Sequence, residues 1–567
     1  MTDPAPAGSR LAPSLGRWVV ASGVLAAVVV APIAALAIFA LQGSADLWQH
    51  LMVHVLPQAV RDTFVLLAGV GLLAAAVGTG AAWLVSAYDF PGRRLLDWAL
   101  LLPLAVPTYI VAYAYLDILH PVGPVQTALR SWLGIDSPRD FRLPDIRSMF
   151  GCIVLLGFVL YPYVYLTTRA MFLMQAANLV DAARTLGTRR SRVFFRVALP
   201  LARPAVAIGL SLVLMEALND IGASEFLGIR TLTVSIYTTW VTRSDLPGAA
   251  QIALAMLAAV VALVAFERWA RRQRRYANDA QQPRPMVPFK LRGARAALAL
   301  AAGSLPVALG FLIPAAYLAD ATVDRVRFAG VSRLLLSETL NTLTLSALAT
   351  GLTLAGGVVI VYAARVSRGF WPAFCARIVA TGYAVPGTVL AIGLLPVVTS
   401  IDGILDRTAS SLFGASTGLL LLTSGAALVY AYVARFLAVA AGGVEAGFSR
   451  VSLSLDDVAR TLGEGAGRRL RRIHLPMTRP ALAAAALLVF VDCMKELPAT
   501  LLLRPIGFET LATHLYGEAV RGTYEDGALA ALLIVAAGLL PVLLLARLGR
   551  ASLHDRRASD LVEPFGA

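Results

Sequence analysis

Acidic side chains cluster directly after two apolar segments of the sequence. The members of the two clusters are Glu216, Asp220, Glu225, Asp492 and Glu496. Carboxylate oxygens are preferred ligands of hard cations, and charges at membrane depth are costly enough to indicate function. Asp220 and Glu496 are 276 residues apart and are candidates for transient metal ligands. The alternative is structural, because carboxylates at such positions also cap helices or pair with Lys495 and Arg504.

The sequence offers no nucleotide site and no catalytic set. A Walker A loop requires a lysine followed by serine or threonine. The two lysines are Lys290, which precedes Leu291, and Lys495, which precedes Glu496. The metalloprotease pattern H-E-x-x-H does not occur, and the three cysteines form no C-x-x-C pair. We therefore expect a protein that is not an enzyme, that holds no cofactor and no firm metal site, and that depends on a separate ATPase for any ATP-derived energy.

The elements that position these residues are predicted to be membrane-spanning helices. Hydrophobic residues make up 58% of the chain and charged residues only 15%, and the mean hydropathy is +0.73. Apolar runs recur with the length of about 20 residues that a helix needs to cross a bilayer. The sequence thus predicts an all-α polytopic membrane protein with about twelve transmembrane helices. The expected spans lie near residues 18–41, 62–86, 98–118, 148–168, 204–219, 248–266, 296–319, 339–363, 378–398, 414–434, 480–496 and 527–546.

The distribution of positive charge predicts the orientation of these spans. Most of the 49 lysines and arginines fall in one alternate set of connecting segments, which favours the cytoplasm for that set and for both chain ends. The same rule accounts for the net charge of +15 without nucleic acid as a partner. Residues 267–295 are basic and proline-rich, which is typical of a cytoplasmic linker that could also contact lipid headgroups.

The sequence on the two sides of this linker is repeated. Pro107 and Pro386 lie 279 residues apart, and so do Tyr237 and Tyr516. An even number of spans separates the copies, so they are expected to be parallel repeats related by an axis along the membrane normal. We expect a path between them. The predicted organisation is a first half at 1–266, the linker at 267–295 and a second half at 296–567.

One repeated element lies in equivalent cytoplasmic segments of the two halves, at 181–200 and 457–476. Each copy reads as a short helix with an Asp and an Arg three residues apart on one face. A glycine six residues after the Asp can end the helix in a left-handed conformation, and it lets a partner approach closely. A Leu-Pro pair then leads into the next span. The sequence predicts a rigid knob on the inner surface, joined directly to a membrane helix.

These residues resemble the EAA loop of binding-protein-dependent ABC importer permeases. The resemblance covers nearly the whole chain, with departures at Asp181 and Asp457 in place of Glu, at Val458 and at Val197. In that family the short helix is the coupling helix, which docks on the ATPase subunit. The coupling role carries over to Asp181, Ala182, Ala183, Gly187, Leu199, Pro200, Asp457, Ala459, Gly463, Leu475 and Pro476.

Within that family, three segments are most similar to the ferric-iron importer group. They are residues 102–113, 216–220 and 495–505. The resemblance implies the type I permease fold, with a fused chain that replaces a permease dimer in the inner membrane. It implies alternating access, two copies of an ATPase subunit, and a periplasmic or lipoprotein substrate-binding protein that delivers ferric iron. The expected residues of the translocation path or gate are Glu216, Asn219, Asp220, Glu225, Asp492 and Glu496.

Other functions remain open at this point. Fused permeases for thiamine and for phosphonates are built alike, so the same machinery could import one of these or another small solute. An ion-coupled secondary transporter would need ionisable groups deep in the spans, and this chain has few away from the span ends. Such a transporter would also have no use for two docking knobs.

Overall fold

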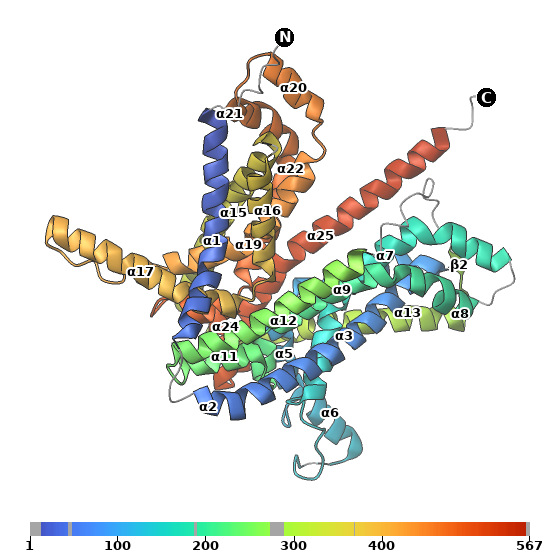
Figure 1. The fold of residues 1–567 in the computed structure, drawn as a ribbon. Coiled ribbons are helices and arrows are strands. Elements are labelled where there is room, and N and C mark those ends of the chain that lie inside the picture. Colours follow the sequence, from blue (N-terminus) through green and yellow to red (C-terminus); the bar gives the residue numbers. More distant parts are fainter. Residues whose placement is uncertain are drawn as a thin grey trace. The chain divides into compact units, whose positions relative to one another are not determined.

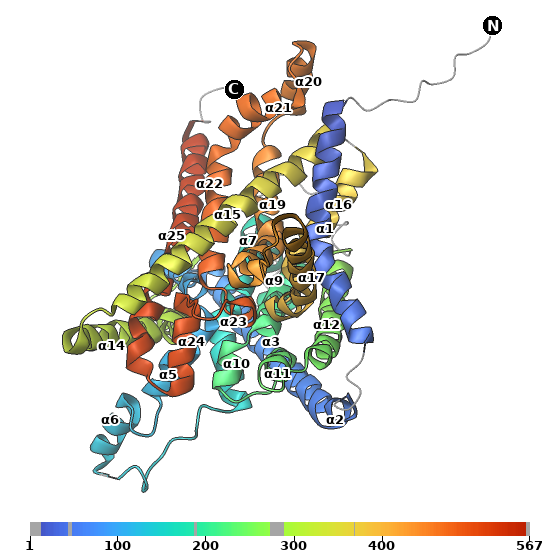
Figure 2. The same cartoon turned by 90° about the vertical axis from the view of Figure 1, so that its left-hand side faces the viewer.

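The computed structural model describes residues 13–42, 48–135, 137–185, 190–272, 288–367 and 369–562. Nearly all of them are helical, and the chain forms two compact units. Unit 1 contains residues 1–42 and 340–508, and unit 2 contains residues 43–339 and 509–567. Figures 1 and 2 show the arrangement of the helices within each unit.

Unit 1 consists of long helices with short ones at their ends. Helix α1 packs along α16 and α17, and α19 packs along α22. In Figures 1 and 2, α20 lies at the end of unit 1 where α1 begins. The bounds are α1 Pro13–Leu41, α15 Arg333–Ser367, α16 Phe370–Thr381, η6 Gly382–Ala384, α17 Gly387–Phe413, α18 Leu420–Thr423, α19 Ala426–Phe448, α20 Leu453–Thr461, α21 Ala466–Arg469, η7 Leu470–His474, α22 Leu475–Met494 and α23 Pro498–Leu503.

Unit 2 is built around α3, which packs along α7 and α9, while α14 and α24 pack on α25. Strands β1 (Tyr88–Asp89) and β2 (Phe289–Lys290) pair in parallel. The helical bounds are α2 Trp48–His50, η1 Leu51–Val55, α3 Leu56–Ala87, α4 Arg93–Ala99, η2 Leu102–Ala105, α5 Thr108–Ile118, α6 Pro124–Leu133, α7 Met149–Thr185, α8 Arg190–Val193, η3 Phe194–Ala198, α9 Leu199–Asn219, α10 Gly222–Phe226, α11 Leu232–Val241, α12 Leu246–Arg272, α13 Ala294–Val307, η5 Ala308–Leu312, α14 Ile313–Ala329, α24 Leu511–Arg521 and α25 Tyr524–Val562.

Each unit takes in helices from both halves of the sequence. The N-terminal helix α1 packs in unit 1 with helices of the second half, and α13, α14 and α25 of the second half pack in unit 2. The boundaries predicted at 266 and 296 describe the sequence repeat and the linker, and they remain a prediction.

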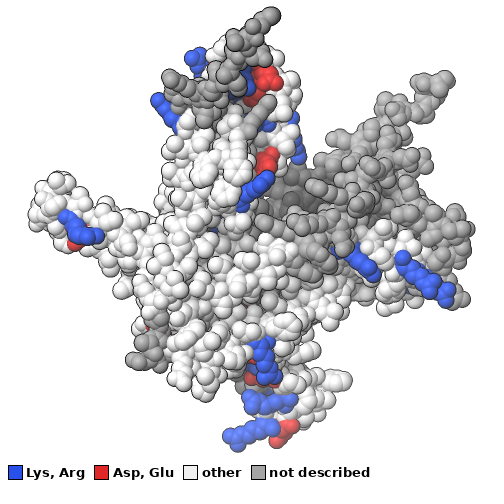
Figure 3. All heavy atoms as spheres, viewed as in Figure 1, with Lys and Arg blue, Asp and Glu red and all other residues white. Residues whose placement is uncertain are grey.

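The membrane class expected from the sequence is confirmed. Among the described residues, eleven helices are long and apolar enough to cross a bilayer, or twelve if one bent pair is a single span. Large apolar side chains cover the outside of these helices, with Phe64 72% and Leu72 76% exposed. Figure 3 shows charged side chains gathered near α20 and around α6, while the described helix flanks in that view carry few. Such uncharged flanks suit contact with lipid.

The third expected span, 98–118, is not one straight helix. It consists of residues 93–105 and helix α5, which meet at an angle of 92°. Pro107 lies at the break and has no backbone N–H to donate, while Val106 before it is extended, as residues before proline prefer to be. The proline therefore breaks the helix inside an apolar run that reads as continuous.

The corresponding proline of the second half has the same local structure. Pro386 precedes α17 with φ −59° and ψ 145°, and Pro107 precedes α5 with φ −57° and ψ 145°. The spans expected at 378–398 and 414–434 were misplaced, because the structure has α17 at 387–413 and α19 at 426–448. Helix α17 ends at Gly414 in a left-handed conformation, and α19 begins after a second such glycine, Gly425. Hydropathy alone does not predict where these glycines end one helix and begin the next.

Candidate functional site

The predicted knob of the second half is a separate short helix, α20. The side chain of Ser452 caps its start and accepts a hydrogen bond from the backbone N–H of Ser454 at 3.2 Å. Gly463 follows its end with φ +77°, the left-handed conformation that its position predicted. A Cβ atom at Gly463 would have no neighbour within 4 Å, so this side of the knob is open.

The outer face of α20 is partly apolar although it is exposed. Val458 is 56% exposed and Leu462 is 77% exposed. Beside them, Asp457 and Arg460 form a loose pair at 4.0 Å and are more than half exposed. Ala459 is buried on the opposite face. A short helix that presents apolar side chains outward has the composition of a docking surface.

The inner face of α20 is held by a buried ionic cluster that sequence reasoning missed. The Asp456 carboxylate accepts a hydrogen bond from Arg365 Nε at 2.8 Å and lies 2.7 Å from His474 Nε2. Arg469 lies 3.8 Å from the same carboxylate. Burial acts to raise the pKa of Asp456, but hydrogen bonds from Arg365 and His474 hold this pKa below its usual value. One feature of the sequence could have indicated this cluster. Asp456 is an acidic residue next to the motif, and the first half has no acidic residue at the equivalent position.

The same cluster ties α20 to three membrane helices. Arg365 near the end of α15 also donates to the carbonyl oxygens of Phe448 at 2.6 Å and Val451 at 2.7 Å. His474 lies in the turn that leads into α22. The Tyr362 hydroxyl of α15 donates to the Ala466 carbonyl at 2.6 Å. These contacts join α20 to α15, α19 and the start of α22.

The first knob is described only in part. Helix α7 continues through Asp181, Ala182 and Ala183 to Thr185, but the side chains of these residues and all of Gly187 lie outside the described residues. Leu199-Pro200 opens α9 just as Leu475-Pro476 opens α22. A π-helical turn precedes each Leu-Pro pair, at 194–198 and at 470–474. A π-turn inserts an extra residue where a helix cannot continue regularly. The backbone therefore enters the membrane helix in the same way in both copies.

Two of the predicted path carboxylates make structural contacts. Asp220 is buried and accepts the backbone N–H of Ser224 at 2.8 Å, near the start of α10. Glu496 is buried and accepts the backbone N–H of Ala499 at 3.2 Å and a bond from Arg435 at 3.0 Å. The backbone contacts match the capping alternative, while the arginine that pairs with Glu496 is Arg435, which the sequence did not indicate. Any role of the two carboxylates in transport stays a prediction.

The other predicted path residues lie close to these positions in the chain. Glu216 and Asn219 are half-buried in the last turns of α9. Asp492 forms an ion pair with Lys495 at 2.8 Å. In the described part of the chain, no group of three or more His, Cys, Asp or Glu side chains could hold a metal ion.

Glu225 has a different environment, because a helix of the second half reaches it within unit 2. The Tyr516 hydroxyl of α24 donates to Glu225 Oε2 at 2.8 Å. The Tyr516 ring stacks on Phe226 with centroids 5.6 Å apart and meets Tyr237 edge to face at 6.1 Å. Burial raises the pKa of Glu225 above its usual value. Sequence reasoning selected Glu225 and noted the two tyrosines only as markers of the repeat.

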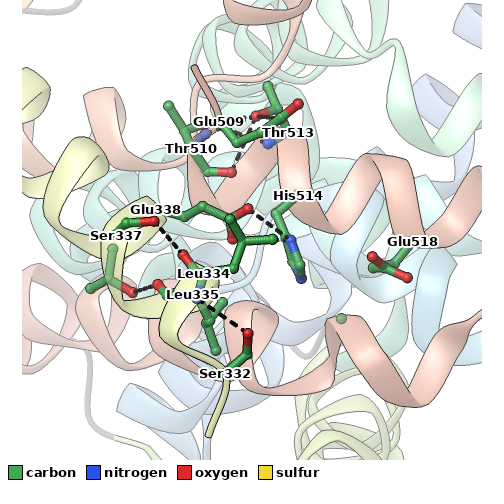
Figure 4. Close-up of polar contacts among 12 residues, drawn as sticks. Ser332, Leu334, Leu335, Ser337, Glu338, Glu509, Thr510, Thr513, His514 and Glu518 are labelled. Atoms are coloured by element: carbon green, nitrogen blue, oxygen red, sulfur yellow. Dashed lines mark hydrogen bonds and ion pairs between the residues drawn. The ribbon is translucent and has the colours of Figure 1, made fainter. Parts of the chain in front are cut away.

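Helix α24, which carries Tyr516, is fixed at its start (Figure 4). Thr510 and Thr513 form a capping box, in which each side chain accepts the backbone N–H of the other at 3.3 and 2.9 Å. His514 Nδ1 lies 3.0 Å from a carboxylate oxygen of Glu338, in the first turns of α15, which belong to unit 2. Burial acts to lower the pKa of His514, but the hydrogen bond and charge of Glu338 raise it above its usual value.

One short match to a hydrolase motif has no catalytic context. Residues 414–418 read G-x-S-x-G, but they lie in the exposed loop after α17 and not on a turn from a strand to a helix. Ser416 of this loop donates to Asp406 at 2.6 Å, which ties the loop to the helix before it.

Comparison with known proteins identifies relatives of both halves. The profile of the family described as "Binding-protein-dependent transport system inner membrane component" matches residues 70–276 and again residues 356–557. The Fe(3+)-transport system permease protein FbpB 2 of Haemophilus influenzae is 24% identical over 491 residues, which cover 86% of this chain and 89% of that protein.

Two relatives that are named for other substrates match a smaller part of the chain. The molybdenum transport system permease protein ModB of Escherichia coli is 30% identical over 194 residues, 33% of this chain and 81% of that protein. The sulfate transport system permease protein CysT of the same species is 28% identical over 189 residues, 32% of this chain and 65% of that protein.

Proposed function

Because the chain belongs to the family of binding-protein-dependent transport system inner membrane components, we propose that it forms the entire membrane path of an ATP-driven importer of ferric iron. Two copies of an ATPase subunit dock on the two knobs, and an extracytoplasmic binding protein delivers the substrate. Both chain ends lie in the cytoplasm, as the positive charges predict. The halves rock between inward-open and outward-open states when the ATPase subunits close.

The coupling role of the second knob is supported by its two faces. Val458 and Leu462 are apolar and exposed, so a partner that covers them gains free energy from their burial. On the other face, the buried Asp456 cluster joins α20 to α15 and α22. When the partner moves α20, these contacts should move α15 and α22 with it.

The main support for ferric iron as the substrate is that the Haemophilus influenzae ferric permease aligns with both halves of this chain. The Haemophilus influenzae ferric permease aligns with 86% of this chain, whereas the molybdenum and sulfate permeases align with about one third of it. The shared layout of two fused halves favours the ferric group. A molybdenum compound is the second candidate, because ModB has the higher identity where it aligns.

Reconstitution tests the function directly. We would place the purified chain in proteoliposomes with its ATPase and binding protein and measure uptake of radioactive iron delivered by the loaded binding protein. We expect uptake with ATP, no uptake with a non-hydrolysable ATP analogue, and no effect of collapsing the ion gradient. The same vesicles receive radioactive molybdate. Uptake of molybdate without iron uptake would replace the proposed substrate, and uptake that persists without ATP would contradict the importer mechanism.

A further inference from the structure

Three side chains of unit 2 that carry oxygen atoms are in contact through Tyr516, and two of them are repeat-related tyrosines. Tyr516 donates from its hydroxyl to Glu225 at 2.8 Å and is also hydrogen-bonded to Tyr237. The two tyrosine rings meet edge to face with centroids 6.1 Å apart. The result is a set of one carboxylate and two phenol groups.

The repeat makes the two tyrosines of this set equivalent positions. Tyr237 and Tyr516 lie 279 residues apart and are equivalent in the two copies. Their helices, α11 and α24, each begin at an equivalent threonine whose side chain caps the helix. Two equivalent residues that touch each other must lie on either side of the axis that relates the copies. A path that follows this axis, as parallel repeats arrange it, passes the three oxygens.

Glu225 and Tyr237 are partly exposed, and the chemistry of the three side chains favours binding of a cation. Tyr516 is 8% exposed, but Glu225 and Tyr237 are half-buried and reach the surface of the unit. Within the described residues, Glu225 forms no ion pair with lysine or arginine. A partly buried carboxylate without a compensating charge attracts cations and repels oxyanions.

We propose that Glu225, Tyr237 and Tyr516 form a transient binding site for ferric iron on the translocation path, an inference that rests on the proposed ferric function. Ferric iron is a small, highly charged ion that prefers anionic oxygen ligands, and tyrosine is among the residues that hold ferric iron in proteins. On binding, Tyr516 releases its hydroxyl proton to water and its phenolate oxygen joins the Glu225 carboxylate on the ion. No electron is transferred.

The geometry suits passage rather than storage. Three side chains leave coordination positions open for water or for the next ligand, so the ion is held weakly enough to leave. A phenol coordinates ferric iron as a phenolate, so the Tyr516 proton leaves as the ion binds. The capping box at Thr510 and the His514–Glu338 contact fix α24 and thereby the position of Tyr516 (Figure 4).

A spectroscopic titration tests the site without transport. A phenolate bound to ferric iron gives a visible charge-transfer band, which free ferric chelates of aminocarboxylates lack. We would titrate the purified full chain in lipid nanodiscs with ferric nitrilotriacetate. We expect a band that disappears in Tyr516→Phe, weakens in Tyr237→Phe, and grows as the pH rises because a proton must leave.

The matched control removes a tyrosine hydroxyl elsewhere in unit 2. Tyr115 donates to the Leu309 carbonyl at 2.8 Å, and Tyr115→Phe should retain the full band. Equal bands in the wild type, Tyr516→Phe and Tyr237→Phe would overturn the site. The melting temperature of each variant shows whether a lost band reflects a lost fold, and Glu225→Gln, which keeps the size of the side chain, provides an independent variant.

Uptake measurements test the proposed iron site and the proposed import function separately. In the proteoliposomes described above, Glu225→Gln and Tyr516→Phe should lower iron uptake roughly tenfold or more, the scale at which changes around metal ligands act. If the wild type imports iron and both variants match it, the site is wrong and the ferric function stands. If the wild type imports another solute and no iron, the function fails, and with it the assignment of this site to the transported ion.

Discussion

Asp456 is surrounded by more positive charge than one carboxylate can neutralise. Arg365, Arg469 and His474 all lie within 4 Å of it, and Arg365 and Arg469 are at most 12% exposed in their side chains. The positions that correspond to Asp456, Arg469 and His474 in the first half are Val180, Val193 and Ala198. The sequence of the first half thus lacks counterparts of these three residues.

Replacing Asp456 with asparagine should destabilise the second knob. Asparagine keeps one oxygen acceptor, but it leaves the buried guanidinium of Arg365 without its counter-charge. Removal of one partner of a buried pair costs about 3–5 kcal/mol. We expect a lower melting temperature of the purified chain in detergent, measured by thermal unfolding fluorescence.

The neighbouring residue provides the matched control for this prediction. Asp457 is 61% exposed and only loosely paired with Arg460, and exposed pairs contribute less than about 1 kcal/mol. Asp457→Asn should therefore leave the melting temperature nearly unchanged. An Asp456→Asn variant as stable as Asp457→Asn would show that the cluster does not hold α20.

His514 should give the fold a pH dependence. Its pKa is raised in the folded state by Glu338, so its contribution to stability is full below its unfolded pKa of about 6.5. The contribution is lost as the pH rises through the higher folded pKa. We expect the difference in melting temperature between the wild type and His514→Gln to shrink from pH 6 to pH 9. A difference that grows with pH would contradict the charged pair.

At the scale of elements, we propose that the exposed face of α20 docks the ATPase subunit. Leu462 is 77% exposed, so replacing it with glutamate should cost the fold little but should prevent apolar docking. We expect Leu462→Glu to insert in the membrane normally and to lose co-purification with the ATPase subunit.

An exposed apolar residue on another element serves as the control for docking. Trp132 of α6 is 82% exposed and lies in a segment predicted to be extracytoplasmic. Trp132→Glu should retain the ATPase. If Leu462→Glu also retains it at wild-type levels, α20 does not dock the partner.

Repeat-related elements share backbone detail beyond their shared sequence. Pro107 and Pro386 break helices with the same dihedral angles, and π-helical turns precede Pro200 and Pro476 at the same spacing. These features follow from proline, which removes a backbone donor and crowds the preceding turn. They allow one apolar run to change direction, and they lead from each predicted knob into a membrane helix without a loop.

At the scale of the whole molecule, the chain exchanges helices between its sequence halves. Helix α1 packs against α16 and α17 in unit 1, although the rest of its half belongs to unit 2. Helices α13, α14 and α25 make the reverse exchange. Each sequence half alone therefore lacks partners for some of its apolar helices.

A chain cut within the predicted linker, residues 267–295, should reassemble when its two fragments are produced together. Each fragment alone should be degraded or should aggregate, because its exchanged helices lose the partners that the other fragment supplies, such as α16 and α17 for α1. Co-purification with a tag on one fragment, and the yield of each fragment alone, measure this. A stable first fragment in the absence of the second would contradict the exchange.

The sequence by itself determined the membrane class, the repeat, the short helix of the second knob and the glycine that ends it. These depend on hydropathy, on spacing and on the local conformational freedom of Gly463, all of which one chain segment carries alone. It also selected Glu225 from its charge. The coupling and path roles of the selected residues remain predictions.

Only the tertiary structure decided which residues come together. It joined Asp456 to Arg365 and His474, brought Tyr516 to Glu225, and packed α1 with the second half. It also broke the expected span at Pro107, which hydropathy reads as continuous. The physical reason is that helix packing and ion pairing depend on contacts between residues separated by tens to hundreds of positions, whereas hydropathy and motif spacing register only neighbours along the chain.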